Sequence, residues 1–411
     1  MSHRECRFCG STLQHTFVDL GMSPLANSYL QSEQLNQMEP FYPLHAHVCD
    51  RCYLVQLEQF EHPENIFADY AYFSSYSESW LTHARGYVER AIERFHLGAG
   101  SLVMEVASND GYLLQYFQQK GVPVLGVEPA QNVAEVARRR GVPTISKFFG
   151  LDTARGFQAA GQQADLIVAN NVLAHVPDLK DFVAGLKVAL KPRGTITVEF
   201  PHLLRLMDGN QFDTIYHEHF SYFSFCTSEE IFRKQGLTVF DVEEIQTHGG
   251  SLRLYACHEG APSQQVHPSA LQLREREIAA GIQDLQTYTG FGDRVRETKR
   301  RLLDLLIRLK REGKSIVGYG APAKGNTLLN FCGIGKDFID YTVDVSPHKQ
   351  NHFLPGTHIP ICSPEKIRLT QPDYVLILPW NLRDEIIRQL ADVRGWGGRF
   401  IIPIPTPEVV E

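Results

Sequence analysis

Residues 103–114 read Val-Met-Glu-Val-Ala-Ser-Asn-Asp-Gly-Tyr-Leu-Leu, an apolar run that ends in small and polar residues. The pattern predicts a strand over 102–106 and then a turn that opens a helix. Further apolar runs alternate with helical periods, which places strands at 123–127, 165–169 and 195–200 and helices near 111–120, 130–140 and 178–190. Such alternation is typical of a parallel sheet covered on both faces. We therefore predict a doubly wound α/β domain.

The turn after the first strand carries small and polar residues in the order Glu105-x-Ala107-Ser108-Asn109-x-Gly111. Dinucleotide-binding turns carry G-x-G-x-x-G here, so that a pyrophosphate can approach the backbone. Because the first two glycines are missing, we expect little room for a pyrophosphate. A ligand with a nucleoside and a sulfonium but no phosphate fits this turn better.

The second strand runs into Gly126-Val-Glu128-Pro129, which places an acid 23 residues after Glu105. A carboxylate at the tip of this strand can bind both ribose hydroxyls of a nucleoside. The alternative is an ordinary acid on a surface loop.

A third polar group follows the strand at 165–169, where the chain continues through Asn170 and Asn171 to His175. Strand tips face the ligand crevice in such sheets, so these side chains are expected where cofactor and substrate meet. The three signatures, in this order, resemble class I S-adenosylmethionine-dependent methyltransferases.

The rest of the pattern first completes this sheet and then begins another. A helix at 228–235 and a hairpin of 237–244 with 251–257, joined through Gly249-Gly250, would add antiparallel edges. A polar linker at 258–268 leads into helical stretches at 269–288 and 293–312, divided at Thr289-Gly290. A second alternating unit follows, with strands at 315–319, 338–343, 373–378 and 399–402 and helices at 325–331 and 383–391.

Four of the eight cysteines lie in the first 52 residues, as Cys6-x-x-Cys9 and Cys49-x-x-Cys52. In a reducing compartment two C-x-x-C pairs indicate a tetrahedral thiolate zinc site, with a redox pair or surface thiols as the alternative. Four thiolates leave no open coordination position, so the zinc is expected to be structural. We predict three domains: a zinc-binding module at 1–72, a cofactor-binding domain at 73–260 and a second Rossmann-like α/β domain at 261–411.

The composition is that of an ordinary globular protein, with 43% apolar and 21% charged residues and a net charge of -7. That charge and the absence of a basic run argue against nucleic acid as a partner. No apolar stretch approaches the roughly 18 residues of a membrane span, and Met1–Cys6 lacks the apolar core of a signal peptide. A cytoplasmic location is expected.

The whole chain resembles the sugar C-methyltransferase family, which acts on nucleotide-linked ketosugars in deoxysugar biosynthesis. The resemblance rests on the paired C-x-x-C motifs, the two cofactor motifs, and the stretches Gly318–Asn330 and Val343–Gln350. It implies S-adenosylmethionine as methyl donor, a structural zinc ion and a 4-keto-deoxysugar substrate that is linked to thymidine diphosphate and methylated at C-3. In this family a Y-x-E-H motif borders the sugar, and it falls here on Tyr216, Glu218 and His219. An upstream histidine of the family matches His175.

Methylation of carbon requires that a proton beside the ketone be removed first. A histidine suits this step because its pKa lies near working pH, and a carboxylate can fix its tautomer. We assign His219 as the base and Glu218 as its orienter, with contact to a sugar hydroxyl as the alternative role of Glu218. Tyr216 or His175 could donate a hydrogen bond to the developing enolate oxygen. His217 is expected to be structural.

The loop Gly318–Gly325 follows a strand and opens a helix, so its backbone N–H groups and the helix dipole suit a diphosphate. The alternative is a tight turn whose lysine is simply solvated. The residues predicted to contact the substrate are Tyr72, Tyr76, Tyr222, Gly320, Ala323, Lys324, Asn326 and Lys349. For Tyr72 and Tyr76 the alternative role is packing between domains.

Two other functions compete with methylation. A nicotinamide-dependent oxidoreductase of a nucleotide sugar could use Gly318-x-Gly320, but Ala323 stands where the third glycine is expected and only Asp344 could serve as the acid. A zinc-bearing binding protein with an inactive methyltransferase-like core is the non-catalytic alternative, and His219 argues against it.

Overall fold

The structure, a computed structural model, describes residues 4–62, 64, 73–76, 78–261 and 265–411. The chain forms two compact units, each assembled from separated segments. Unit 1 comprises Met1–Leu13, Cys49–Leu203 and Phe220–Gln283, and unit 2 comprises Gln14–Val48, Leu204–His219 and Asp284–Glu411. Each unit thus combines segments that are distant in the sequence. The division into three consecutive domains stays a prediction.

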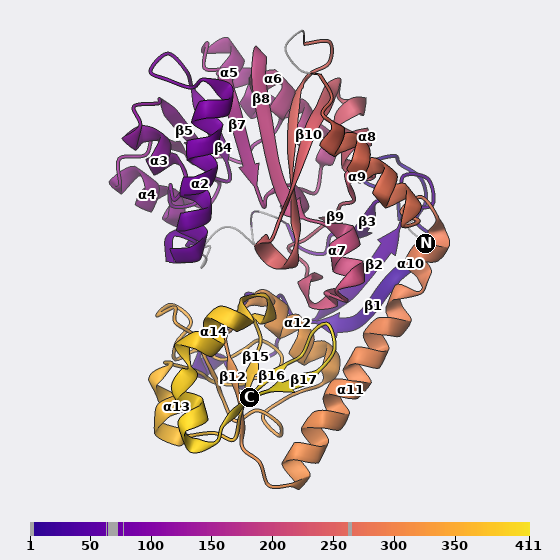
Figure 1. Ribbon diagram of the computed structural model, residues 1–411, viewed down its shortest axis with the longest axis vertical. Helices are drawn as coiled ribbons and strands as arrows, with labels where there is room; N and C mark the ends of the chain where they lie inside the picture. The colour runs from indigo at the N-terminus through magenta and orange to yellow at the C-terminus, as the bar shows by residue number, and fades with distance from the viewer. Residues whose placement is uncertain (1–3, 63, 65–72, 77, 262–264) are drawn as a thin grey trace. The chain divides into compact units, whose positions relative to one another are not determined.

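Unit 1 is built on a seven-stranded sheet with the strand order β10-β11-β8-β7-β4-β5-β6 (Figure 1). Five strands are parallel, and the hairpin of β10 and β11 adds an antiparallel edge beside β8. The strands are β4 (Val103–Val106), β5 (Val124–Val127), β6 (Thr144–Ile145), β7 (Ala164–Asn170), β8 (Leu190–Pro201), β10 (Leu237–Ile245) and β11 (Ser251–His258). The expected doubly wound sheet with an antiparallel hairpin is confirmed.

Helices cover both faces of this sheet because successive strand residues point to opposite faces and both sets are apolar. Val103, Leu166 and Val168 belong to one apolar cluster, and Met104, Ile167 and Ala169 belong to the other. The helices are α2 (Glu78–Phe95), α3 (Leu114–Gln119), α4 (Gln131–Arg139), α5 (Leu151–Ala159), α6 (Leu179–Ala189), α8 (Phe225–Lys234) and α9 (Pro268–Ala279).

One predicted helix is divided. The sequence predicts one continuous helix over 269–288, but α9 ends at Ala279 and α10 (Leu285–Thr289) begins six residues later. Gly281 adopts φ +81° after the end of α9, a conformation that suits glycine, and the Asp284 side chain accepts a hydrogen bond from the N–H of Gln286 at the start of α10. The glycine and the aspartate therefore end one helix and begin the next, although the spacing of apolar residues continues as in a helix.

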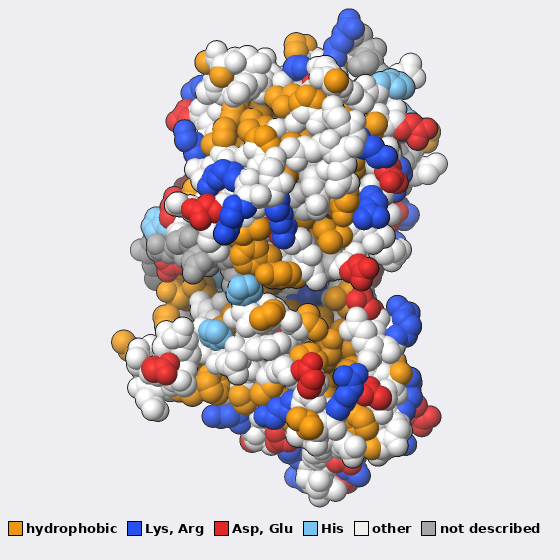
Figure 2. Space-filling view, turned by 90° about the vertical axis from the view of Figure 1, so that its left-hand side faces the viewer, with side chains coloured by type: hydrophobic (Ala, Val, Ile, Leu, Met, Phe, Trp, Pro, Cys, Tyr) orange, Lys and Arg blue, Asp and Glu red, His pale blue; other side chains and the backbone are white. Residues whose placement is uncertain are grey.

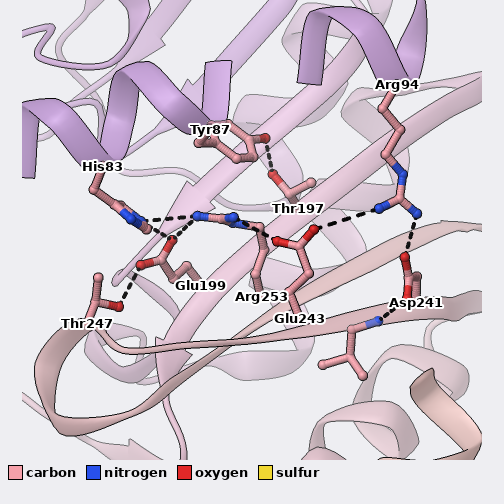
Figure 3. Close-up of polar contacts among 10 residues, drawn as sticks. His83, Tyr87, Arg94, Thr197, Glu199, Asp241, Glu243, Thr247 and Arg253 are labelled. Atoms are coloured by element: carbon pink, nitrogen blue, oxygen red, sulfur yellow. Dashed lines mark hydrogen bonds and ion pairs between the residues drawn. The ribbon is translucent and has the colours of Figure 1, made fainter. Parts of the chain in front are cut away.

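Helix α2 is fixed to the sheet by polar contacts rather than by apolar packing alone (Figure 3). Arg253 of β11 is fully buried and lies 2.8 Å from Glu199 of β8 and 3.0 Å from Glu243 of β10. His83 of α2 lies 3.2 Å from the same Glu199, and Tyr87 of α2 lies under the Arg253 guanidinium. Burial alone would raise the pKa of Glu199, but the hydrogen bond with His83 and the charge of Arg253 outweigh it and hold that pKa below its usual value.

Replacing Arg253 with methionine should destabilise unit 1 by about 3–5 kcal/mol at pH 7, because Glu199 would stay buried without its cation. A carboxyl whose pKa is lowered by folding stabilises the protein above its unfolded pKa, about 4.3, and loses that contribution as the pH falls. The deficit of the variant should therefore shrink towards pH 4. Urea unfolding at several pH values measures it.

The matched control is Arg276→Met, which removes the exposed ion pair with Glu244 and should cost about 1 kcal/mol or less. Equal effects of the two substitutions, or a deficit of Arg253→Met that does not change with pH, would contradict the role of the buried pair.

Unit 2 holds a six-stranded sheet with the order β14-β13-β12-β15-β16-β17, parallel except for the last strand. Its strands are β12 (Ile316–Tyr319), β13 (Thr342–Val343), β14 (Ile361–Cys362), β15 (Tyr374–Ile377), β16 (Arg399–Ile402) and β17 (Glu408–Val410). Its main helices are α11 (Phe291–Arg311), α12 (Ala323–Cys332), α13 (Glu365–Thr370) and α14 (Arg383–Gln389). The second Rossmann-like unit is confirmed, although the strand expected at 338–343 is reduced to two residues.

The N-terminal region forms a β-hairpin that the sequence analysis did not predict. An antiparallel hairpin of β1 (His15–Ser23) and β2 (Tyr42–Val48) belongs to unit 2, where Phe17 stacks on Phe291 of α11 at 4.6 Å between ring centroids. A second small pairing, of β3 (Val55–Leu57) with β9 (Ser221–Tyr222), belongs to unit 1. The first 60 residues therefore serve both units.

Lys and Arg side chains are interspersed with Asp and Glu over the face drawn in Figure 2. None of the described helices combines the length and apolarity of a membrane span.

Candidate functional site

Two matching turns present the four N-terminal cysteines within unit 1. In the first, the N–H of Gly10 donates to the carbonyl of Cys6, and in the second the N–H of Tyr53 donates to the carbonyl of Cys49. Gly10 and Tyr53 both adopt positive φ, of +77° and +58°. Each C-x-x-C pair is thus folded back so that both thiols of the pair point the same way.

The four Sγ atoms fit a zinc ion. All lie within 4.8 Å of one another, with 3.5 Å between Cys6 and Cys52 and between Cys9 and Cys49. Four sulfurs at about 2.3 Å from a tetrahedral zinc ion would lie about 3.8 Å apart. The four cysteines would hold a zinc ion that joins two chain segments, in a structural role.

The expected cofactor residues come together at the carboxyl ends of β5, β4 and β7, which are neighbours in the sheet. Ala107, Asn109 and Gly111 have φ of +57°, +50° and +79°, and Asn171 has φ of +53°. Three of these four residues are not glycine, and backbone strain of this kind clusters at functional sites. The loop after β4 is therefore shaped for a purpose other than simple connection.

Several buried polar atoms at this edge lack a hydrogen-bond partner among the described residues: Glu105 Oε2, Ser108 Oγ, Asn170 Oδ1 and Asn171 Oδ1. An unsatisfied buried polar group costs about 1–3 kcal/mol, so a polar ligand would recover this energy. A nucleoside with an amino-acid tail offers the required donors and acceptors. The residues present thus fit S-adenosylmethionine.

Glu128 lies directly after β5 and fixes the loop after β4. Its Oε2 accepts a hydrogen bond from the N–H of Asn109, and its Oε1 accepts one from the N–H of Ala130, both at 2.9 Å. Burial raises the pKa of Glu128 to about 7, although these N–H groups oppose the shift. Burial likewise raises the pKa of Glu105 well above its usual range. The remaining lone pairs of Glu128 are those that could bind ribose hydroxyls.

The Y-x-E-H motif belongs to unit 2, together with the C-terminal sheet. His217 and Glu218 are buried, whereas Tyr216 and His219 are partly exposed, and their rings pack in a tilted arrangement with 4.0 Å between centroids. His217 Nε2 lies 3.2 Å from the carbonyl of Pro43 in β2, and burial lowers its pKa. Burial therefore favours the neutral form of His217, and its structural role stays a prediction.

His219 is oriented by a backbone carbonyl. Its Nδ1 lies 2.9 Å from the carbonyl oxygen of Thr214, and a carbonyl can only accept, so Nδ1 carries the proton in this contact. The neutral imidazole then has its lone pair on Nε2, the tautomer that a general base requires. The Thr214 carbonyl is thus placed to orient this ring, the role that the sequence analysis predicts for Glu218.

Glu218 has a different partner, which the sequence analysis missed. Its Oε1 accepts a hydrogen bond of 2.7 Å from Asn27 Nδ2, in the segment between β1 and β2. Burial raises the pKa of Glu218 to about 7, against the opposing effects of this bond and of the Lys349 charge. Near neutral pH the carboxyl is therefore protonated in part of the molecules and can donate to an acceptor.

The same segment reaches the loop after β12. Tyr29 OH donates to the carbonyl of Ala321 at 2.6 Å, and Lys349 Nζ donates to the same carbonyl at 2.9 Å. Asn326 of α12 donates to the carbonyl of Ala26 at 2.6 Å. Unit 2 thus brings Glu218 together with several of the predicted substrate residues.

Lys324 lies in the first turn of α12, partly buried against Trp380. Its Nζ lies 4.8 Å from the centre of the Trp380 ring and donates to Asn381 Oδ1 at 2.7 Å. Trp380 Nε1 donates to the buried Asp213 at 2.7 Å, and burial raises the pKa of Asp213 to about 6. Burial also lowers the pKa of Lys324, which argues against a lysine that is merely solvated.

Other predicted residues have different surroundings. Gly320, with φ +88°, forms the turn after β12, and Ala323 is the first residue of α12. Tyr76 is 59% exposed, Tyr222 is buried in β9 and His175 lies in a short 3-10 helix after β7, all in unit 1. Tyr72 lies outside the described residues.

Known families match the chain in three successive stretches. A zinc binding domain matches residues 6–67, a methyltransferase domain matches 80–242 and a C-methyltransferase C-terminal domain matches 246–405. The C-methyltransferase NovU of Streptomyces niveus is 39% identical over 406 residues, which cover 99% of this chain and 96% of NovU.

More distant relatives share only part of the chain. The ubiquinone biosynthesis O-methyltransferase of Bartonella bacilliformis is 27% identical over 101 residues, 24% of this chain and 41% of that protein. The structure of magnesium protoporphyrin IX methyltransferase from Synechocystis with bound S-adenosylhomocysteine is 14% identical and has a TM-score of 0.36 over 44% of this chain and 83% of that chain. With a TM-score this low, the likeness carries no argument about the fold.

The similarity to NovU along nearly the whole length, with the matching C-methyltransferase domain, establishes the family. The zinc-binding match coincides with the four-cysteine cluster, and the methyltransferase match coincides with the sheet of unit 1. The chain therefore belongs to the C-methyltransferase family that its sequence resembles, as an S-adenosylmethionine-dependent enzyme with an N-terminal zinc-binding module.

Proposed function

We propose that the enzyme methylates a ring carbon of a nucleotide-linked 4-keto-deoxysugar, at C-3, with His219 as the base that removes the proton from that carbon. The observation that carries this proposal is the hydrogen bond between His219 Nδ1 and the carbonyl of Thr214. It leaves Nε2 as the acceptor on a partly exposed ring. The chemistry requires such a base, because a carbon beside a ketone becomes nucleophilic only after it loses a proton.

The neighbours of His219 suit the other needs of the enolate. Tyr216 packs against the imidazole and carries a phenol that can donate a hydrogen bond. Glu218, with its pKa raised to about 7, can donate in its protonated form to a sugar oxygen. Donors of this kind stabilise charge on the ketone oxygen as the proton leaves.

The C-terminal sheet of unit 2 supports a nucleotide-diphosphate ligand. The first turn of α12 presents free N–H groups, and Lys324 supplies a cation held by Asn381 and Trp380. Thymidine diphosphate is the nucleotide that the family resemblance implies.

The residues of unit 1 would hold the methyl donor. Glu128 would bind the ribose, and Asn170 and Asn171 would bind the polar groups beside the sulfonium. When bound, S-adenosylmethionine supplies an electrophilic methyl group. The chain contributes by orientation, which can account for a large share of rate enhancement.

A cytoplasmic location accompanies this proposal. None of the eight cysteines is joined in a disulfide, which suits a protein that acts in a reducing compartment.

The proposal is tested by incubating the enzyme with S-adenosylmethionine carrying a ¹³C-methyl group and a thymidine-diphosphate-linked 4-keto-6-deoxysugar. We expect a product whose labelled methyl is bonded to a ring carbon, as seen by carbon–proton correlation spectroscopy. The 4-hydroxy analogue is the control and should not react, because its C-3 proton is not acidic. An O-methyl product, or equal turnover of the 4-hydroxy analogue, would sink the proposal.

A further inference from the structure

The first zinc-binding turn carries an arginine that bonds outside the turn. Arg7 lies between Cys6 and Cys9, and its guanidinium is partly buried in unit 1. Nη1 donates to the carbonyl of Pro177 at 2.9 Å, and Nη2 donates to the carbonyl of Leu57 at 2.5 Å. The same guanidinium lies 5.4 Å from the centre of the Phe220 ring. One side chain therefore joins three segments.

The backbone of Arg7 is fixed by the metal site. Its N–H donates to Gln56 Oε1 at 3.0 Å, and Gln56 Nε2 donates to the sulfur of Cys6 at 3.2 Å. Gln56 lies in β3, opposite Ser221 of β9. The position of Arg7 thus depends on the sulfur cluster, and any shift of the cluster would be passed to the guanidinium.

The segments that Arg7 joins adjoin the proposed reaction groups. Pro177 lies two residues after His175 in the loop before α6, and Phe220 follows His219 in the chain. The N–H of Phe220 donates to the carbonyl of Ala174 at 2.7 Å, and its carbonyl accepts from the N–H of Leu57 at 3.0 Å. Both backbone groups of Phe220 and the end of the His175 loop are thereby held in one network.

An arginine suits this place better than any other residue. Its planar guanidinium presents several donors in fixed directions, so it can bond two carbonyls and pack on an aromatic ring at once. A lysine could reach one carbonyl but could not bridge both. Reaction rates are sensitive to such anchoring, because a displacement of about 1 Å can cost about 10²-fold.

We propose that Arg7 is a positioning residue of the methyl transfer, which couples the zinc cluster to the loop bearing His175 and to the chain that follows His219. The zinc module is then part of the catalytic apparatus as well as a structural element. This inference rests on the proposed function, which assigns His219 as the base, and on the prediction that His175 could donate a hydrogen bond to the enolate oxygen.

The test compares Arg7→Met and Arg7→Lys with the wild type in the full-length, zinc-loaded enzyme. The matched control is Arg4→Met, which removes an arginine of the same segment whose exposed side chain pairs with Glu58. Zinc content, S-adenosylmethionine affinity, kcat and KM are measured for each protein with the ketosugar nucleotide.

For Arg7→Met we expect one zinc per chain, donor affinity and KM within about threefold of wild type, and kcat lower by about 10²-fold. Arg7→Lys should recover part of kcat, because it restores one of the two carbonyl contacts, and Arg4→Met should behave as wild type. This selective loss in kcat at unchanged binding is what a purely structural role would not produce.

Two results would overturn the inference. One is a kcat of Arg7→Met within about twofold of that of Arg4→Met. The other is a loss of activity in both Arg7 variants that only follows a loss of zinc or of donor binding. Wild-type enzyme that fails to methylate the ketosugar would overturn the proposed function itself, so the two failures are distinguishable.

Discussion

Replacement of His219 by alanine is expected to lower kcat by about 10²–10⁴-fold, the usual contribution of a general base. The imidazole is partly exposed and bonds to the Thr214 carbonyl, so its loss should disturb the surrounding structure little. The cofactor residues lie in the other compact unit, and S-adenosylmethionine affinity should therefore stay within about twofold of wild type. Steady-state kinetics and equilibrium binding of the donor measure both quantities.

The matched control for this substitution is His217→Gln, two residues away. His217 is buried, and its Nε2 contacts the Pro43 carbonyl, a bond that a glutamine amide can replace. This variant should keep kcat within about threefold of wild type. If His219→Ala retained more than about a tenth of wild-type kcat, the assignment of His219 as base would be wrong.

The joint replacement of Cys6 and Cys9 by serine is expected to abolish stoichiometric zinc binding and to unfold the N-terminal module. Two of four thiolates would be lost, and structural zinc sites supply about 10–16 kcal/mol of apparent binding energy, which is also folding energy. Metal analysis of the purified protein and thermal unfolding measure the effect.

Cys362→Ser serves as the control, because Cys362 lies at the end of β14 in unit 2 rather than in the sulfur cluster of unit 1. It should leave both the zinc content and the unfolding temperature nearly unchanged. Retention of one zinc per chain in the Cys6 and Cys9 double variant would contradict the four-thiolate site.

The regular parts of the fold could be predicted because their signals are local. The strand at 102–106 and those at 165–169 and 399–402 are continuous apolar runs, and they appear as β4, β7 and β16 within one or two residues. The hairpin of β1 and β2 had no comparable signal. Buried and exposed residues do not alternate regularly along β1, and its pairing with β2 is interrupted between Thr16 and Val18 and between Asp19 and Met22.

Candidate site residues could be proposed from the sequence only where they form a recognisable motif. The four cysteines and the Y-x-E-H motif are of this kind. Asn27, Thr214 and Arg7 do not, because each acts through a contact with a residue five to 191 positions away. A backbone carbonyl such as that of Thr214 has no signature at all, since every residue has one.

The measurement that tests the central claim most directly is solvent hydrogen exchange at the carbon beside the ketone. The ketosugar nucleotide is incubated in D₂O with S-adenosylhomocysteine and either wild-type enzyme or His219→Ala, and the C-3 proton signal is followed by nuclear magnetic resonance. Wild-type enzyme should exchange this proton without methyl transfer, and His219→Ala should not exceed the rate without enzyme by more than about tenfold. Exchange by His219→Ala at the wild-type rate would contradict the account.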